Sequence, residues 1–125
     1  MVSRRHALWL IAPACLVAWL CLRSPVPEPD SATAERLEAA AELWWQPGGT
    51  GRDIPEADWP TELRRLGPEA VTVAAEGVYI RFGTRFVEAW GLFVLPRGSE
   101  FQPRQGADPS FRPVRGRIYR YDIKG

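Results

Sequence analysis

Apolar and polar residues alternate between Val71 and Leu95, and this pattern predicts three β-strands joined by two tight turns. We expect Glu76-Gly77 and Gly83-Thr84 to form two-residue hairpin loops, because each contains a glycine that can adopt positive φ. Side chains of a strand alternate between faces, so these loops place one apolar set on a single side of the sheet. That predicted core face comprises Val71, Val73, Ala75, Val78, Ile80, Phe82, Gly91, Phe93 and Leu95.

The opposite face of the predicted sheet mixes aromatic, aliphatic and charged residues, among them Phe86, Leu92 and Val94. A bulge at Gly91 would shift every later side chain to the other face. Because aromatic and charged side chains together suit a contact surface, four residues of this face are candidates for binding. They are Tyr79, Arg81, Glu88 and Trp90.

Two helices are predicted before the sheet. The first is capped by Asp30 or Ser31 and runs to about Gln46, with apolar residues at helical spacing. The second spans Pro60–Leu66 and is stopped by a glycine-proline pair. Near the end of the first helix, Trp44-Trp45 has two interpretations: a ligand platform or, as we favour, an anchor that covers a face of the sheet.

A long irregular segment from Pro96 to Arg115 follows the third predicted strand. Non-repetitive segments of this length are uncommon in compact domains and are often functional. Residues 97–125 carry a net charge of +4 against −6 for residues 24–96, so this segment could bind an acidic polymer, a phosphate group or an acidic partner. The alternative is a solvated loop held to the core by two phenylalanines. If the segment binds a ligand, its candidate binding residues are Arg97, Phe101, Arg104, Phe111 and Arg112.

A last strand is predicted over residues 117–123, where aromatic and polar side chains alternate. We expect it to join the three-stranded sheet, either at its edge or beside the first strand.

The first residues have the pattern of an export signal, since Arg4 and Arg5 precede an apolar run over residues 7–22. Trp9 and Trp19 near the two ends of the run suit the interfaces of a spanning helix. No small-x-small cleavage site follows directly, so we favour an uncleaved signal anchor over a cleaved signal peptide. The positive charge before the run predicts a cytoplasmic N-terminus and an exported C-terminal domain.

Cysteine and histidine are confined to the N-terminal region. Cys15 and Cys21 lie in the apolar run and His6 precedes it, so residues 22–125 contain neither type. This composition excludes disulfides, thiolate or imidazole metal sites, Ser-His-Asp triads and cysteine nucleophiles from the domain. We therefore predict no cofactor, no metal site and no catalytic residue, and expect the protein not to be an enzyme.

Four stretches of the chain have distinctive sequences. They are Gly77-Val78-Tyr79-Ile80, the run from Phe86 to Pro96 (FVEAWGLFVLP), Asp108-Pro109-Ser110-Phe111, and the run from Gly116 to Gly125 (GRIYRYDIKG). Through these stretches the chain resembles a group of small, uncharacterised bacterial exported or membrane-anchored proteins, and the resemblance covers about half of the chain. The resemblance implies one fold and a location in the cell envelope, and it implies no activity.

Together these features predict an α+β fold: an N-terminal membrane anchor, then one or two helices packed on a small, mainly antiparallel sheet of about four strands. The predicted divisions are a signal anchor or signal peptide over 1–22, a proline-rich linker over 23–30 and one exported domain over 31–125. The expected location is the bacterial inner membrane, with a single span and a periplasmic C-terminal domain. Secretion to the periplasm after signal cleavage is the alternative.

Three kinds of function remain open. The first is a non-catalytic, membrane-tethered accessory module that binds an envelope protein or an acidic envelope polymer, with membrane contact through residues 7–22 and no nucleic-acid partner. The second is an inhibitory or immunity-like protein with one periplasmic partner. The third is a glycan-active enzyme that works with carboxylates alone. Its candidates are Glu88 with Asp122 or Asp108, assisted by Tyr119 or Tyr121. The oligomeric state and the identity of the ligand stay open.

Overall fold

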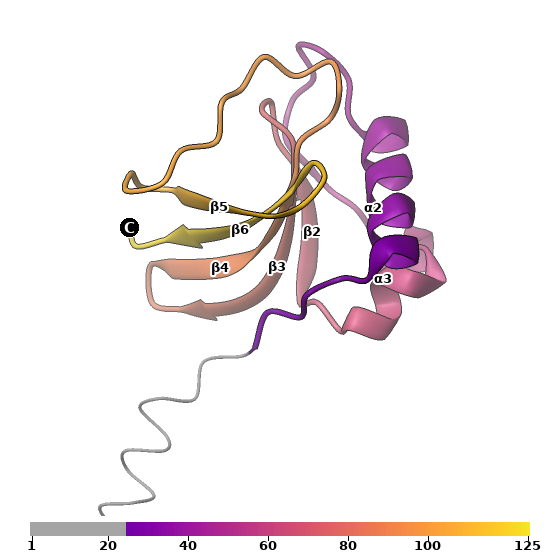
Figure 1. The fold of residues 1–125 in the computed structure, drawn as a ribbon, viewed down its shortest axis with the longest axis horizontal. Helices are drawn as coiled ribbons and strands as arrows, with labels where there is room; N and C mark the ends of the chain where they lie inside the picture. Colours follow the sequence, from indigo (N-terminus) through magenta and orange to yellow (C-terminus); the bar gives the residue numbers. More distant parts are fainter. Residues whose placement is uncertain (1–24) are drawn as a thin grey trace, which may run out of the picture.

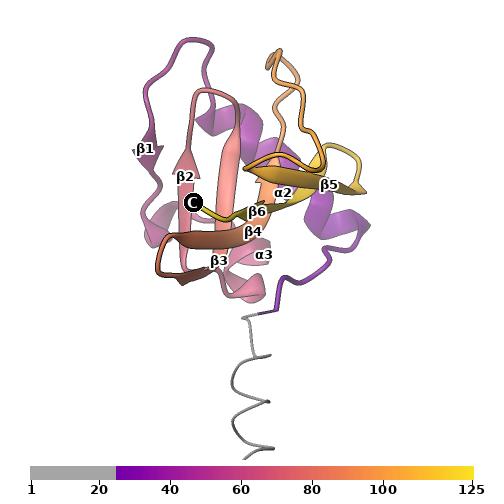
Figure 2. The ribbon, with the colours of Figure 1, turned by 90° about the vertical axis from the view of Figure 1, so that its left-hand side faces the viewer.

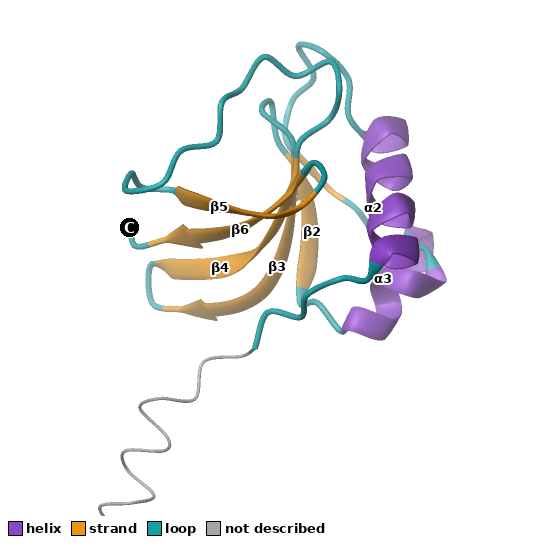
Figure 3. Ribbon diagram, in the orientation of Figure 1, coloured by secondary structure: helices purple, strands orange, loops and turns teal. Residues whose placement is uncertain are grey.

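The structure, a computed structural model, describes residues 25–125 and consists of a six-stranded antiparallel sheet with two short α-helices (Figures 1 and 3). The strands are ordered β1-β2-β3-β4-β6-β5, and every neighbouring pair is antiparallel. The elements are α2 (Ser31–Trp44), β1 (Arg52–Asp53), a 3₁₀ turn η1 (Glu56–Asp58), α3 (Thr61–Leu66), β2 (Ala70–Val73), β3 (Val78–Arg85), β4 (Glu88–Val94), β5 (Ser110–Arg115) and β6 (Ile118–Ile123).

The sheet corrects the predicted fold class, because it has six strands where about four were expected. The short strand β1 adds to β2, and β5 forms from the end of the segment that was predicted to be irregular. The last strand, β6, lies between β4 and β5 and is neither at the edge nor beside the first strand. β5 takes the edge instead, and Pro113 within it suits that place because a proline cannot donate to a central ladder.

The predicted membrane anchor is also corrected. Within residues 25–125, no helix combines the length and the apolar character that crossing a membrane requires. The anchor predicted over residues 7–22 lies outside the described residues. The single-pass inner-membrane location is therefore not upheld by the structure and is not carried further.

The two predicted helices are confirmed, and local signals explain their ends. The carboxylate of Asp30 accepts a hydrogen bond from the backbone N–H of Thr33 at 2.8 Å and caps the first turn of α2. α3 begins after Pro60 and ends at Gly67, whose φ of 72° is a left-handed conformation that glycine adopts without steric strain. Both helices lie on the same side of the sheet (Figures 1 and 2).

In the first hairpin, Val73 pairs with Val78, so its loop has four residues instead of the predicted two. The loop is closed by a hydrogen bond from the N–H of Ala74 to the carbonyl of Gly77 at 2.8 Å. Because the register moved by two residues, the parity of the strands is preserved. Val71, Val73, Val78 and Ile80 therefore share one buried face, as predicted.

In the second hairpin, the predicted turn and the predicted faces of β4 are wrong. β3 continues through Gly83-Thr84, and the chain reverses at Phe86-Val87. A register shift between Arg81 and Gly83 marks a bulge in β3. Gly83 serves a different purpose from a turn, because a Cβ at this position would overlap the indole of Trp90.

Because of the bulge and the later turn, the side chains of β4 lie on the opposite faces of the sheet from those predicted. Leu92 and Val94 pack with Val71 under the helices, whereas Phe93 faces away from them. The helix-covered face is the larger core. Its buried members are Ala34, Leu37, Ala41, Trp45, Ile54, Trp59, Leu63, Val71, Val73, Val78, Ile80, Phe82, Leu92, Val94 and Ile118.

Candidate functional site

The face of the sheet that points away from the helices carries a cluster of aromatic rings. Phe93, Phe111 and Tyr121 are its buried centre, and Tyr79 and Phe101 are half-buried around it. Ring centroids lie 4.9 Å apart for Tyr79 and Phe93, 5.0 Å for Tyr79 and Tyr121, and 5.0 Å for Phe93 and Phe111. Tilted and edge-on pairs at these separations are favourable beyond the burial of their area. We call this set, with Tyr119, the aromatic face.

Strand register explains why these rings meet. Phe93 of β4 is directly opposite Tyr79 on one neighbouring strand and Tyr119 on the other. Phe111 of β5 is directly opposite Tyr121 of β6. Side chains of directly paired residues lie on the same side of a sheet, so three strand pairings build one aromatic row across four strands.

The loop of residues 96–109 covers part of the aromatic face, and contacts of Ser99 and Phe101 fix its first half. The ring of Phe101 lies 5.7 Å from Phe93 and 5.4 Å from Phe111, both edge-on. The hydroxyl of Ser99 donates to the carbonyl of Glu76 at 2.7 Å, which fixes the first part of the loop. Because a covering of loop residues seals a sheet less completely than a helix, the rim of this face stays accessible.

A pocket of about 520 Å³ opens beside this loop. The rings of Phe101 and Phe111 provide its apolar side, and the Arg104 guanidinium provides a positive charge. Within residues 25–125, the Arg104 side chain donates no hydrogen bond and joins no ion pair. We call this site the loop pocket. Its lining residues are Glu100, Phe101, Gln102, Arg104, Ala107, Asp108, Pro109 and Phe111.

The loop pocket is held open by backbone contacts. The N–H of Phe111 donates to the carbonyl of Arg104 at 2.8 Å, and the Asp108 carboxylate accepts from the N–H of Lys124 at 2.8 Å. The first of these bonds also occupies the outer edge of β5, and Pro113 two residues later has no N–H to offer. This edge is therefore poorly suited to addition of a partner strand, and side chains are the means of contact that remain.

Two tyrosines of the aromatic face keep their protons. Burial raises the pKa of Tyr79 well above its ordinary value of 10.0, and the nearby Glu76 raises it further. Burial also raises the pKa of Tyr121, with a partly opposing effect of Arg81. At neutral pH both phenols are protonated, so they can donate hydrogen bonds and cannot act as phenolate bases or nucleophiles.

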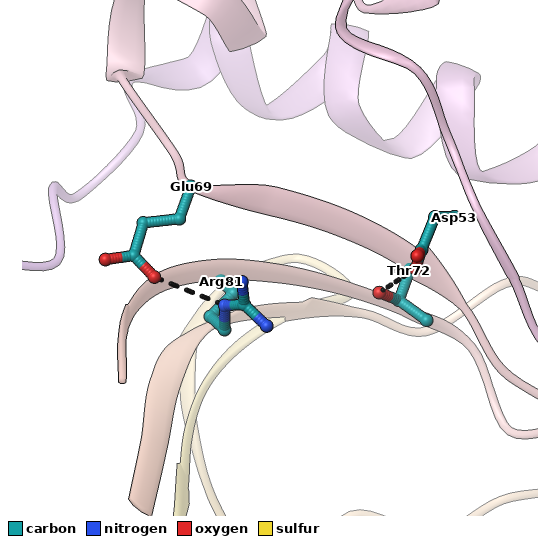
Figure 4. Close-up of polar contacts among 4 residues, drawn as sticks. All are labelled: Asp53, Glu69, Thr72 and Arg81. Carbon is teal, nitrogen blue, oxygen red and sulfur yellow. Dashed lines mark hydrogen bonds and ion pairs between the residues drawn. The ribbon is translucent and has the colours of Figure 1, made fainter. Parts of the chain in front are cut away.

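The sequence-predicted residue Arg81 lies at the polar rim of the aromatic face. Its Nε is 3.2 Å from a carboxylate oxygen of Glu69, and both side chains are about two-fifths exposed (Figure 4). Further along the same rim, the hydroxyl of Thr72 donates to the Asp53 carboxylate at 2.8 Å (Figure 4). These paired groups border the rings with polar side chains: the charges of Arg81 and Glu69 balance, and Asp53 adds one negative charge.

The structure does not bring the other sequence-predicted residues to this site. Trp90 is buried on the opposite face, beside Gly83. Glu88 begins β4 opposite Arg85, at the far end of the hairpin. Arg97 is exposed near α2, where its backbone N–H donates to the Glu42 carboxylate at 2.7 Å.

The remaining candidate, Arg112, is exposed and lies directly opposite Arg120 on the helix-side face of β5 and β6. Of the nine candidate residues, five therefore lie on or beside the aromatic face. Tyr79, Phe101 and Phe111 belong to it, Arg81 lies at its rim, and Arg104 lines the loop pocket with Phe101 and Phe111.

The two tryptophans at the end of α2 have different surroundings. Trp45 is buried and its indole N–H donates to the carbonyl of Ala75 at 3.0 Å, which supports the interpretation as an anchor. Trp44 is half-buried and lines a second pocket of about 410 Å³. The guanidinium of Arg52 donates to the carbonyl of Trp44 at 2.9 Å in this pocket. The tandem pair Trp44-Trp45, with its alternative interpretation as a ligand platform, was the only sequence signal for this pocket.

The carboxylates proposed for an enzyme are distributed over different surroundings. Asp108 lines the loop pocket, whose lining includes neither Glu88 nor Asp122. Asp122 is opposite Trp90, and Glu88 is two residues away along β4, so this pair is diagonal on the helix-side face. Among the residues described, no three histidine, cysteine, aspartate or glutamate side chains gather as a metal site would require.

No protein-family model, curated protein or solved structure matches this chain. The resemblance to small bacterial exported proteins stays a prediction that rests on its four stretches of sequence.

Proposed function

We propose that the domain is a non-catalytic binding module whose loop pocket accepts a ligand that combines an apolar or aromatic group with a negative charge. The observation that carries this proposal is that Arg104, whose side chain has no hydrogen-bond or ion-pair partner among the described residues, lines a pocket together with Phe101 and Phe111. An acidic segment of a partner protein, or an acidic envelope polymer with an apolar substituent, would present this chemistry.

The two parts of the pocket have separate roles. The half-buried ring of Phe101 offers a surface against which an apolar group loses contact with water, and the ring of Phe111, which is 3% exposed, packs behind it. Arg104 offers a fork of N–H donors that matches the geometry of a carboxylate or phosphate. Glu100 and Asp108 at the margin would repel a ligand whose negative charges are not placed at the guanidinium, and this favours one orientation.

The loop pocket is formed before any ligand arrives, which favours binding. Ser99 ties the loop to the first hairpin, and the Phe111–Arg104 and Lys124–Asp108 bonds hold its second half. A preformed site loses less conformational entropy when it binds than a loop that must first become ordered.

A pair of small probes tests the proposal. Phenylacetate carries a ring and a carboxylate, and phenylacetamide is its neutral counterpart of the same shape. In an NMR titration of the full chain, we expect phenylacetate to shift the backbone amides of residues 100–111 with roughly millimolar affinity, as suits a ligand of this size. Phenylacetamide should bind more weakly because it cannot use the charge of Arg104.

Two arginine variants make the test specific. Arg104→Gln should remove the advantage of phenylacetate over phenylacetamide, whereas Arg97→Gln should leave it unchanged because Arg97 lies beside α2. Equal affinity for both probes, or shifts that do not concentrate on residues 100–111, would contradict the proposal.

A further inference from the structure

The tip of the β3–β4 hairpin presents two large apolar side chains to solvent. Phe86 is 96% exposed and Val87 is 71% exposed, and together they form the whole turn. The tip lies at the end of the sheet remote from α2 and α3 (Figure 1). An exposed pair of this kind contributes nothing to the core of its own domain, so its presence calls for a different explanation.

Phe86 also adopts a backbone conformation that is unfavourable for its residue type. Its φ is 56°, in the left-handed region, and it is the one described residue other than glycine with a positive φ. A bulky residue is a genuine outlier there, and glycine is the residue that hairpin turns of this kind favour. The fold would therefore be served better by glycine at position 86. Strain at a residue without packing contacts indicates a role outside folding.

Charges around the tip are balanced in sign. Arg85 is directly opposite Glu88 at the base of the turn. Gly125 lies close against Val87, and the preceding Lys124 is held through its backbone by the Asp108 carboxylate. The turn is thus flanked at its base by one positive and one negative residue, and the neighbouring Lys124 and Asp108 add one of each sign. An anionic lipid surface would be matched by a cluster of arginines and lysines, which this collar does not provide.

We propose that the Phe86-Val87 tip is a docking element that inserts into an apolar pocket on a partner protein, with the phenyl ring of Phe86 as the central anchor. An aromatic side chain on a rigid turn suits this purpose, because it offers a large contact area with few rotatable bonds. The neutral collar fits a pocket rimmed by mixed charges. This inference goes beyond the binding role of the loop pocket and does not depend on it, because none of the pocket's lining residues belongs to the tip.

Site-specific photo-crosslinking in the cells that naturally produce the chain tests the proposal. A photoreactive benzoylphenylalanine replaces Phe86 in the full chain, and the same group replaces Leu43 as the control position. Leu43 is 81% exposed on α2, so it matches Phe86 in access to solvent while it lies on a regular helix. We expect one protein adduct from position 86 that is absent from position 43, with the crosslink mapped to an apolar pocket of that protein.

Phe86→Gly then separates docking from folding. With the purified partner, this variant should bind about tenfold more weakly or worse, as is typical of an anchor residue, while Leu43→Ala binds normally. The thermal unfolding midpoint of Phe86→Gly should equal or exceed that of the unchanged chain. Binding to vesicles of phosphatidylglycerol and phosphatidylethanolamine should be the same with and without the substitution.

Several results would overturn the proposal. They are lipid adducts from position 86, the same adducts from both positions, no adduct at all, or vesicle binding that Phe86→Gly removes. A lower unfolding midpoint for Phe86→Gly would show that the ring supports the fold. The two proposals can fail separately. If the unchanged chain did not respond to phenylacetate but position 86 still formed its crosslink, the loop pocket would be rejected and the proposal for the tip would remain.

Discussion

Leu92 and Phe93 are consecutive residues of β4 and both are 0% exposed, but they point to opposite faces of the sheet. Leu92 lies in an aliphatic core that two helices cover. Phe93 lies among aromatic rings that a loop covers only in part, and its neighbours Tyr79 and Tyr119 remain half-buried. The centres of the two faces are equally dry, and the difference between them lies at their rims.

This difference gives the two faces different roles: one stabilises the fold, and the rim of the other is accessible to a ligand. Helices α2 and α3 cover the centre of the aliphatic face, so a ligand could reach that centre only if the domain opened. The aromatic face is bordered by the loop pocket and by the exposed Arg81–Glu69 pair, where groups can meet a ligand without unfolding. We therefore expect substitutions under the helices to affect stability most, and substitutions at the rim of the aromatic face to affect the loop and binding.

The largest effect is expected from Leu92→Ala. It removes a fully buried side chain beneath the helices and leaves a cavity, which should lower the free energy of unfolding by about 2–5 kcal/mol. Leu43→Ala is the matched control, because the exposed Leu43 should change stability by less than about 0.5 kcal/mol. Urea unfolding followed by tryptophan fluorescence measures both, and equal values for the two variants would refute the placement of β4.

High pH should weaken the aromatic face selectively. The pKa values of Tyr79 and Tyr121 are raised in the folded chain from the ordinary value of 10.0. Above pH 10.0 the unfolded chain therefore releases phenol protons that the folded chain retains, and stability falls as the pH rises further. The slope can reach about 1.4 kcal/mol per pH unit for each tyrosine, and less for Tyr79 because solvent screens its partly exposed ring.

A double substitution tests this alkaline effect. The chain holds a single lysine, so few other groups of the domain titrate in the same range. Urea midpoints measured across this range should decline steeply for the unchanged chain and much less for Tyr79→Phe combined with Tyr121→Phe. Parallel curves would mean that the phenols are not responsible.

Phe101→Ala should have a smaller effect, confined to the loop. The ring of Phe101 is half-buried and joins the loop of residues 96–109 to Phe93 and Phe111, so its loss should cost about 1–2 kcal/mol. Hydrogen exchange of the loop amides from residue 99 onward should accelerate while that of α2 is unchanged, because the loop contacts α2 and its C-cap through Arg97 and Gly98, before Phe101. Acceleration in α2 as well would show that the two faces are coupled.

Local signals made the helices predictable, whereas tertiary contacts decided the second hairpin. The cap at Asp30 and the break at Gly67 act within one turn of the chain, and both were recognised. Gly83 looked like a turn residue, but its absent Cβ makes room for the Trp90 ring, and the actual turn places a phenylalanine where glycine is favoured. The local sequence pattern does not indicate that the glycine lies in the strand and the phenylalanine in the turn.

The candidate site was predictable in part for the same reason. Phe101, Arg104 and Phe111 were found because aromatic and basic residues interleave in one long segment. Trp90 was assigned to the same face because the bulge between Arg81 and Gly83 was not predicted. The exposure of Phe86 could not be seen until the register of β3 and β4 was known.

The smallest effect is expected at the start of α2, at acid pH. Hydrogen bonds from Thr33 hold the pKa of the Asp30 carboxyl below its ordinary value of 3.8. A lowered pKa stabilises the fold above pH 3.8, and this contribution is lost as the pH falls through the folded-state pKa. Asp30→Asn keeps an oxygen that can cap Thr33 and cannot titrate, so it should match the unchanged chain at neutral pH and lose less stability in acid. Urea midpoints compared above and below pH 3.8 measure the difference, with Asp30→Ala as the variant that lacks the cap at every pH. This carboxylate acts mainly on the cap of α2, with a smaller effect of Arg115, so an acid effect of equal size in Asp30→Asn would place the origin of the acid sensitivity elsewhere in the domain.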